Sequence, residues 1–324
     1  MSSLSEIKKP VEKEMILFEE YFNRSFKSDV PLLKIILNYI FRRKGKQMRP
    51  LLVLLSAKLN GEVNEATYVA ATLIELLHTA SLVHDDVVDD ARERRGALSI
   101  NALWNSKIAV LTGDYMLATG LLVSVEKKRY EMLEIVSEAV RSMSQGELLQ
   151  LQKARKMNIQ EADYFKIIRS KTAALIAACT ACGAISVTDN PEIIASMKQM
   201  GEEIGIAFQI KDDILDYEGN SLTGKLKGND IKERKITLPL IYALENSSFL
   251  TRRKILHIVR KRNKTNEETG QVIKFVQENR GIEYALEKMN HYRDRALAHL
   301  QSYPPSDVRN SLREFVRYTV SRES

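Results

Sequence analysis

Residues 64–91 read NEATYVAATLIELLHTASLVHDDVVDDA, an apolar run that ends in four aspartates. Its apolar side chains recur every three or four residues, which predicts one long helix, and Asn64 is a residue type that favours the helix N-cap. The chain has 7 prolines, and none of them lies between residues 51 and 190. Because proline interrupts helix interiors, this distribution favours long helices over sheets and turns.

The same helical period extends over most of the chain. A helix should begin with Leu51, directly after Pro50, since proline is favoured in a first turn. Gly96 should mark the break after the 64–91 helix. Residues 219–235 read as a polar loop, no alternating pattern predicts a β-hairpin, and no linker divides the chain. We therefore expect one all-α domain over residues 1–324. Further helices are predicted at about 107–127, 130–157, 161–187, 191–218, 237–247, 250–262, 267–279, 282–302 and 306–321.

Composition excludes several classes of protein. A hydrophobic content of 44% with 28% charged residues is typical of a soluble globular chain. The two cysteines, Cys179 and Cys182, cannot make a disulfide framework, and we interpret their C-x-x-C spacing as helix packing. The N-terminus lacks a signal-peptide core, and no uncharged apolar stretch reaches about 18 residues. We therefore predict no membrane span and a cytoplasmic location.

Positive charge is unevenly distributed in a chain with 49 Lys+Arg and 42 Asp+Glu. One basic cluster lies at 42–49 and a second at 252–264. We interpret the second cluster as a solvated helix face. A nucleic-acid binder would need a basic stripe and a recognisable module, and neither is apparent.

Seven of the 14 aspartates fall in two short clusters, and each cluster contains a D-D-x-x-D motif, at 85–89 and 212–216. Each motif lies at the C-terminal end of a predicted helix. Residues three and four apart share a helix face, so like charges meet there, and the helix dipole adds to the cost. Two carboxylates about 4 Å apart near a surface repel by up to about 4 kcal/mol. A hard cation removes this repulsion, and oxygen ligands favour Mg²⁺. The sequence therefore predicts metal sites at both motifs.

Cationic segments accompany the two acidic motifs: Gly45 to Pro50, Arg94-Arg95-Gly96, Lys171-Thr172, and the loop from Thr223 to Lys235. Paired carboxylates, several Lys and Arg residues and no Cys/His nucleophile arrangement suit Mg²⁺-mediated binding of a diphosphate.

Taken together, the motifs resemble the all-trans polyprenyl diphosphate synthases over nearly the whole chain. They are G-K-x-x-R-P at 45–50, His78, D-D-x-x-D-(x4)-R-R-G at 85–96, Gly113-Asp114, Lys171-Thr172, F-Q-x-x-D-D-x-x-D at 208–216, and the 223–235 loop. Two departures are visible: Ala97-Leu98-Ser99 replaces a common polar-Pro-Thr, and Arg234 replaces the usual glycine before Lys235.

The resemblance implies an isoprenoid synthase-type bundle of antiparallel helices around a deep central cavity, usually as a homodimer. Asp85 and Asp89 would bind two Mg²⁺ ions and Asp212 a third, with Asp86, Asp213 and Asp216 in supporting contacts. The allylic diphosphate would be surrounded by Arg94, Lys171, Thr172, Gln209, Lys225 and Lys235. Isopentenyl diphosphate would be held by Lys46, Arg49, His78 and Arg95. The Thr172 hydroxyl, the Lys171 carbonyl and the Gln209 amide would stabilise the allylic carbocation, which implicates all three in catalysis.

Chain length should depend on the residues upstream of Asp85. In the family, short-chain enzymes tend to carry a bulky aromatic four or five residues before this aspartate, where this chain has Ser81 and Ala80. We therefore expect the product to pass toward Leu77, Leu76 and Leu73, with a floor on the 107–127 helix such as Leu121 or Leu122. The implied product is heptaprenyl to nonaprenyl diphosphate for a quinone side chain, with a membrane needed only for product release.

Several alternatives remain open at this point. A short-chain farnesyl or geranylgeranyl diphosphate synthase would share every motif except the small pair before Asp85. A class I terpene cyclase usually has an Asn/Ser/Glu-type second metal site and needs no isopentenyl pocket. A regulatory subunit of a heteromeric synthase typically lacks one or both aspartate motifs. A basic nucleic-acid binder would bind without Mg²⁺ and weaken with salt.

Overall fold

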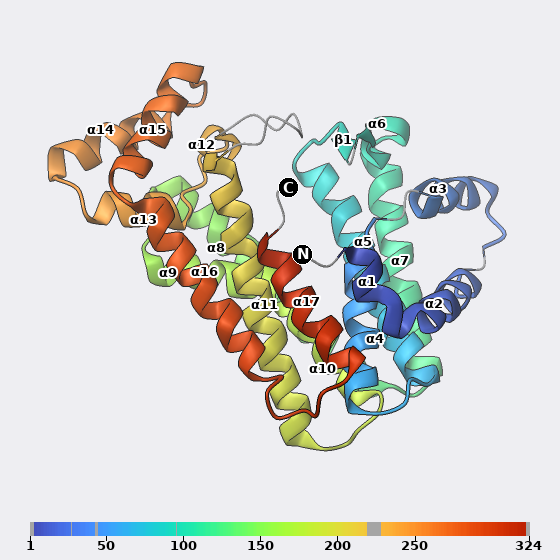
Figure 1. Ribbon diagram of the computed structural model, residues 1–324. Helices are drawn as coiled ribbons and strands as arrows, with labels where there is room; N and C mark the ends of the chain where they lie inside the picture. Colours follow the sequence, from blue (N-terminus) through green and yellow to red (C-terminus); the bar gives the residue numbers. More distant parts are fainter. Residues whose placement is uncertain (1–2, 27, 43–44, 95, 219–227, 322–324) are drawn as a thin grey trace.

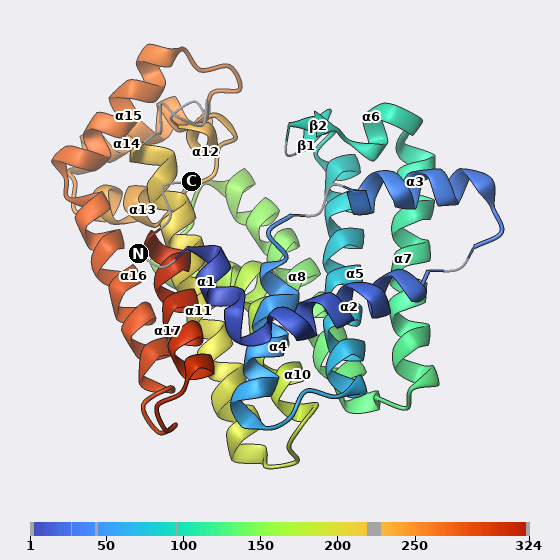
Figure 2. The ribbon, with the colours of Figure 1, turned by 45° about the vertical axis from the view of Figure 1, so that its right-hand side comes forward.

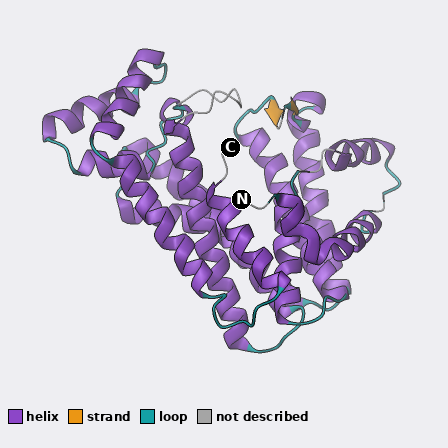
Figure 3. Cartoon of the chain, in the orientation of Figure 1, coloured by secondary structure: helices purple, strands orange, loops and turns teal. Residues whose placement is uncertain are grey.

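The computed structural model of the chain describes residues 3–26, 28–42, 45–94, 96–218 and 228–321. Helices make up nearly all of its regular structure, which confirms the predicted all-α class (Figure 3). The only strands in these ranges are β1 (Glu93–Arg94) and β2 (Ala97–Leu98), which pair antiparallel.

The helices of the N-terminal half are α1 (Leu4–Lys8), a 3₁₀ turn (Lys9–Val11), α2 (Glu12–Arg24), α3 (Pro31–Arg42), α4 (Met48–Asn60), α5 (Glu65–Val88), α6 (Ile100–Trp104), α7 (Ser106–Glu126) and α8 (Tyr130–Lys156). Those of the C-terminal half are α9 (Glu161–Ile168), a π turn (Arg169–Ala173), α10 (Ala174–Ile185), α11 (Pro191–Glu218), α12 (Asn229–Lys232), α13 (Leu238–Glu245), α14 (Phe249–Arg260), α15 (Asn266–Glu278), α16 (Gly281–Ala298) and α17 (Asp307–Ser321).

Long helices pack side by side to form the body of the molecule. Helix α5 packs against α7, α10 lies against both α4 and α11, and α16 covers α11 (Figure 1). The carboxyl ends of α5 and α11 point to the same end of the molecule, where α12 and the β1–β2 hairpin also lie (Figures 1 and 2). Because each of these helices carries one D-D-x-x-D motif at that end, the fold brings the two acidic motifs to one rim.

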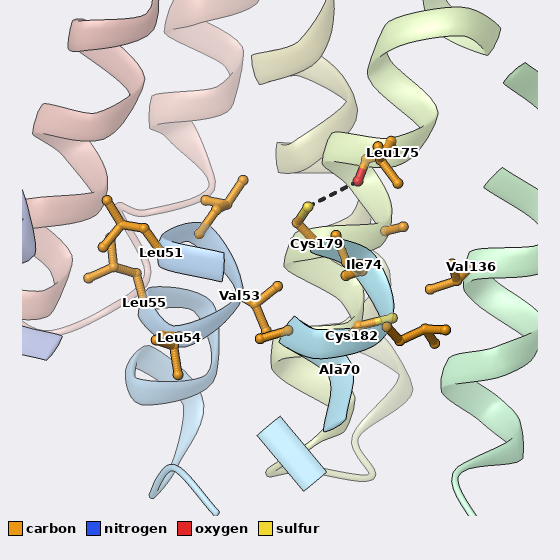
Figure 4. Close-up of a cluster of buried hydrophobic side chains, with 14 of the residues drawn as sticks. Leu51, Val53, Leu54, Leu55, Ala70, Ile74, Val136, Leu175, Cys179 and Cys182 are labelled. Carbon is orange, nitrogen blue, oxygen red and sulfur yellow. Dashed lines mark hydrogen bonds between the residues drawn. The ribbon is translucent and has the colours of Figure 1, made fainter. Parts of the chain in front are cut away.

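The main core lies between α4, α5, α8 and α10, where leucine, valine, alanine and isoleucine side chains are excluded from water (Figure 4). Cys179 and Cys182 are fully buried in this core, and the Cys179 thiol donates to the Leu175 carbonyl at 3.1 Å. Both cysteines are free. Burial raises the pKa of the Cys179 thiol to about 12. This placement confirms that the two cysteines serve helix packing.

Most predicted helices occur close to their expected bounds. Asn64 caps α5 as predicted, since its side chain accepts a hydrogen bond from the Ala66 amide at 2.8 Å. The expected extension of α5 to residue 91 is wrong, because the helix ends at Val88 and Asp89 is its C-cap. The prediction that the chain contains no β-hairpin is also wrong. The chain turns at Gly96, whose φ of 71° suits glycine, and β1 pairs with β2. Helix α12 lies inside the expected polar loop.

Three helical segments of the described chain are long and apolar enough to cross a membrane by length and composition: α5, α7 and the run Glu161–Ile185. The sequence had predicted no membrane span, because no uncharged apolar stretch reaches about 18 residues. In the apolar windows of α5 and Glu161–Ile185, 72% and 67% of the residues are buried inside the bundle, against 33% for α7. Helix packing therefore accounts for the hydrophobicity of the first two segments, whereas α7 leaves an apolar face exposed.

Candidate active site

The first acidic motif occupies the last turn of α5 and its C-cap. Asp85 and Asp89 are exposed there, whereas Asp86 is only 3% exposed. The Arg94 Nε donates to Asp86 Oδ1 at 2.6 Å, so Asp86 anchors the β1–β2 hairpin against α5. Partial desolvation raises the pKa of Asp85, an effect that the positive charge of Lys171 opposes. The motif thus offers two open carboxylates and one that already has a cationic partner.

The second acidic motif, in the last turns of α11, also combines an exposed carboxylate with buried or hydrogen-bonded ones. Asp212 is exposed, while Asp213 is only 4% exposed. The two carboxylate oxygens of Asp216 accept the backbone amides of Asn229 and Asp230 at 2.9 and 3.1 Å. Asp216 therefore receives the start of α12 and fixes it next to the motif.

A chain of hydrogen bonds links Asp213 to the residues predicted to stabilise the carbocation. Asp213 Oδ2 accepts from the Tyr164 hydroxyl at 2.6 Å, and its Oδ1 accepts from Gln209 Nε2 at 2.9 Å. The Gln209 Oε1 in turn accepts from the Thr172 hydroxyl at 2.8 Å. Burial raises the pKa of Asp213 well above its usual range. In the structure Asp213 thus orients the Gln209 amide, with its oxygen toward Thr172.

Lys171 and Thr172 lie in the π turn Arg169–Ala173, which interrupts the predicted 161–187 helix. Such turns are rare and often occur at functional sites. Glycines on the neighbouring helices allow the turn to pack closely. A Cβ on Gly146 of α8 would lie 3.0 Å from the Lys171 amide nitrogen, and one on Gly205 of α11 would lie 2.5 Å from the Ala173 Cα.

The cations Lys171 and Lys235 lie between the two acidic motifs. Lys171 forms an ion pair with Glu147, and its charge also acts on Asp85. Opposing effects act on the pKa of Lys235, and their net result is a raised pKa. Burial alone would lower it. A hydrogen bond to Glu233 at 2.6 Å and the charges of Glu233, Asp230 and Asp89 outweigh burial. Lys235 therefore remains charged at neutral pH.

A pocket of about 150 Å³ collects most of the predicted allylic-site residues. Its predicted lining residues are Lys171, Thr172, Gln209, Asp212, Asp213 and Lys235. Tyr164 and Asp230, for which no role was predicted, also line it. Burial and the nearby Asp216 charge raise the pKa of Asp230 to about 6. Lys225 lies outside the described residues.

A second pocket, of about 380 Å³, lies along α5. His78 lines it together with Gly45 and Gln47, which flank Lys46, and with Arg94. Lys46 itself is exposed, and its Nζ donates to the Tyr318 hydroxyl at 3.2 Å. Part of its lining is aromatic and comes from helices for which no role was predicted: Phe18 and Phe22 of α2, and Tyr39 and Phe41 of α3.

The remaining residues predicted for isopentenyl diphosphate are placed differently. Arg49 lies in the first turn of α4, next to the loop that carries Lys46. Arg95 lies outside the described residues. The roles assigned to all of these side chains stay predictions.

The two small residues upstream of Asp85 lie on different faces of α5. A helix turns by about 100° per residue, so Ser81 shares the face of Asp85, while Ala80 shares that of Leu76 and His84. This second face packs on α7: Cβ atoms added at Gly113 and Gly120 would meet His84 at 2.2 Å and Leu76 at 3.6 Å. Ala80 is fully buried there.

The expected path of the product tunnel stays a prediction, whereas its expected floor does not lie inside this chain. Leu76 packs against Gly120 of α7 and does not share the face of Ser81. Leu73 lies eight residues before Ser81, in the row that runs through Leu77, and its side chain also reaches Gly120. Leu121 and Leu122 are 43% and 58% exposed, so neither closes a cavity inside this chain.

Within the described ranges, no three Asp, Glu, His or Cys side chains converge closely enough to hold one metal ion. Mg²⁺ commonly binds one or two carboxylates and completes its shell with water and substrate phosphates. The exposed carboxylates of Asp85, Asp89 and Asp212 fit that requirement, because each is an oxygen donor at the rim shared by the two motifs.

Comparison with known proteins agrees with this geometry. The family described as "Polyprenyl synthetase" matches residues 30–276. The all-trans-nonaprenyl-diphosphate synthase (geranyl-diphosphate specific) of Rhodobacter capsulatus is 35% identical over 97% of this chain and 96% of its own. A polyprenyl synthase from Caulobacter crescentus CB15, crystallised with calcium and isoprenyl diphosphate, is 32% identical with a TM-score of 0.90, over 99% of this chain and 98% of its own. Geranylgeranyl pyrophosphate synthase from Bacteroides thetaiotaomicron is 41% identical with a TM-score of 0.85, over 99% of this chain and 100% of its own. The chain therefore belongs to the polyprenyl synthetase family of prenyltransferases.

Proposed function

We propose that the chain is a long-chain all-trans polyprenyl diphosphate synthase, which adds isopentenyl diphosphate head-to-tail to an allylic diphosphate. The observation that carries the proposal is the pair of acidic helix ends on α5 and α11, which share one rim with Lys171 and Lys235 between them. Two pockets flank this rim, of about 150 and 380 Å³. A reaction between two diphosphates requires two such sites, whereas a terpene cyclase requires only one.

The allylic substrate is assigned to the smaller pocket. Bound Mg²⁺, three ions in the full proposal, would neutralise the diphosphate and make it a better leaving group. Asp85, Asp89 and Asp212 would hold the metal, and Lys171 and Lys235 would contact diphosphate oxygens. The Thr172 hydroxyl, the Gln209 amide oxygen and the carbonyl of Lys171 would face the allylic carbocation, where oxygen dipoles stabilise positive charge.

Isopentenyl diphosphate is assigned to the larger pocket, with His78 on its wall and Lys46, Arg49 and Arg95 as diphosphate ligands. Its double bond would attack the carbocation, and the released diphosphate would accept the proton that leaves. Arg94 contributes to this arrangement by its bond to Asp86, which keeps the hairpin against α5.

A long product is supported by the small residue Ser81 on the Asp85 face and by the R. capsulatus relative named for a nonaprenyl product. We place the product between heptaprenyl and nonaprenyl diphosphate, suited to a quinone side chain. The short-chain alternative draws on one specific observation, the 41% identity to a geranylgeranyl pyrophosphate synthase.

We further propose that one polyprenyl synthase domain spans residues 1–324, that it works in the cytoplasm, and that it forms a homodimer through α7 and α8. Leu111 and Leu122 of α7 and Leu148 of α8 are each between 58% and 68% exposed, and a second copy would cover them.

Release of diphosphate separates the synthase from a cyclase. Purified protein is incubated with Mg²⁺ and farnesyl diphosphate, with and without isopentenyl diphosphate. The proposal predicts that diphosphate is released in proportion to the isopentenyl diphosphate consumed. Rapid release from farnesyl diphosphate alone would reject it.

A further inference from the structure

Helix α14 lies in the segment that carries the entire net charge of the chain. Residues 246–266 contain 7 Lys and Arg residues and no Asp or Glu, against a net charge of +7 for all 324 residues. The other 303 residues therefore balance, with 42 residues of each sign. Charge concentrated in this way points to a partner of opposite sign.

The outer face of α14 combines these cations with exposed apolar side chains. Ile255, Ile258 and Val259 are buried on the inner face of the helix. Phe249 and Leu250, its first two residues, are 75% and 76% exposed. A solvated helix face, as the sequence suggested for residues 252–264, explains the cations but not this apolar pair.

One shallow groove on the surface of α14 joins the two kinds of side chain. Leu250 lines it together with Arg253, Lys254, His257 and Arg260, which follow at intervals of three and four residues and so share one face of the helix. Lys261 just beyond pairs with Glu268.

Helix α14 lies at the same end of the molecule as the active-site rim. In both views α14 and α15 extend beside α12, at the end where the carboxyl ends of α5 and α11 lie (Figures 1 and 2). A flat partner that covers α14 would thus approach the rim from which a diphosphate product leaves.

We propose that α14 docks the enzyme on an anionic lipid bilayer. Phe249 and Leu250 enter the boundary between headgroups and acyl chains, and Arg253, Lys254 and Arg260 contact lipid phosphates. A basic face with an aromatic and an aliphatic residue beside it is typical of helices that lie on membranes, and each nearby Lys or Arg adds attraction to anionic lipid. A nucleic acid would pair with the cations, but it offers no apolar surface for an aliphatic side chain such as Leu250.

The inference rests on the proposed function in one respect, because a long polyprenyl product requires an apolar phase to receive it. Docking of α14 would place that phase beside the rim. The cytoplasmic enzyme would then meet the membrane through one defined surface.

Vesicle sedimentation tests the proposal independently of activity. Full-length protein is mixed with phosphatidylcholine vesicles or with vesicles that also contain phosphatidylglycerol, at low and high salt. We expect at least tenfold more binding to the anionic vesicles at low salt. The charge reversal Arg253→Glu/Lys254→Glu and the change Phe249→Ser/Leu250→Ser should each reduce that binding about tenfold or more.

Lys9→Glu/Lys13→Glu is the matched control, since it makes the same charge change at two exposed residues of the N-terminal helices. It should bind as wild type, and circular dichroism should show that all variants are folded. Equal binding to both kinds of vesicle, or no effect of the α14 charge reversal, would overturn the proposal. Loss of binding with the charge reversal but not with the apolar change would also overturn it, because a generic polyanion site would then suffice.

Turnover in detergent solution should be unchanged in the α14 variants. A protein that docks on vesicles but makes no prenyl product would refute the proposed function alone, whereas an active enzyme that ignores anionic vesicles would refute only the docking surface.

Discussion

The π turn that carries Lys171 and Thr172 depends on the absence of a side chain at Gly205. In Gly205→Ala the new Cβ would lie 2.5 Å from the Ala173 Cα, whereas ordinary contact begins near 3.4 Å. The turn and α11 must therefore move apart by about 0.9 Å, the difference between these two distances. The hydrogen bond from Thr172 to Gln209, now 2.8 Å long, crosses the same interface and would exceed hydrogen-bond range.

Misplacement of catalytic groups by about 1 Å can cost about 100-fold in rate. We expect Gly205→Ala to lower kcat about 100-fold. Overpacking should lower the stability of the fold by about 1–3 kcal/mol, and the higher helix propensity of alanine, about 1 kcal/mol, partly offsets this loss. Steady-state kinetics and thermal unfolding measure the two effects. Gly270→Ala on α15 is the control, because its Cβ would meet nothing within 4 Å. It should keep full activity and gain about 0.5–1 kcal/mol of stability. Wild-type kcat in Gly205→Ala would refute the reasoning.

Three further predictions concern side chains of α5, α9 and α10. Ser81→Phe should shorten the product with turnover retained, since the ring would lie on the Asp85 face. Ala80→Phe should instead destabilise the protein by about 1–3 kcal/mol, because its ring collides with α7. Chromatography of the products and thermal melts distinguish the two outcomes. Tyr164→Phe removes a 2.6 Å hydrogen bond to the buried Asp213, so we expect a loss of about 1.5–3 kcal/mol and a lower kcat, measured by denaturant unfolding and kinetics. The two α10 thiols should resist a thiol reagent at pH 8 until the protein unfolds, because burial raises the pKa of Cys179 to about 12 and thiolate is the reactive form.

Each of these predictions has a clear contradiction. An unchanged long product in Ser81→Phe would remove that residue from the tunnel. Tyr303→Phe, which loses a 2.7 Å bond to Asn60 far from the rim, should lower stability without changing kcat. If Tyr164→Phe behaved in the same way, Asp213 would not orient Gln209. Rapid labelling of either thiol in the native protein would contradict the packing of α10.

The sequence predicted those features that depend on local periodicity. The helical repeat gave the α class and most helix positions, and the spacing of the aspartates placed Asp85 with Asp89 on one face. The spacing alone could not separate Asp86 from its neighbours, because the role of Asp86 depends on Arg94, which the hairpin brings back to it. Only the family resemblance supplied that division. The π turn was equally hidden, since it requires glycines from two other helices.

Tertiary contacts also decide which aspartates are free to bind metal and which ones support neighbouring residues. Asp213 differs from Asp212 because it faces the bundle interior, where Tyr164, 49 residues earlier in the chain, donates a hydrogen bond to it. Likewise, Ala80 and Ser81 are adjacent in sequence, and only the position of α7 shows that they face different neighbours.

The most direct test of the central claim is the size of the product. Wild-type protein, Asp85→Ala and Asp212→Ala are incubated with Mg²⁺, farnesyl diphosphate and labelled isopentenyl diphosphate, and the products are sized by chromatography after phosphatase treatment. The account predicts a wild-type product in the heptaprenyl to nonaprenyl range, lost on metal chelation and reduced by orders of magnitude in both folded variants. A wild-type product that stops at geranylgeranyl, or near-normal turnover in either variant, would contradict it.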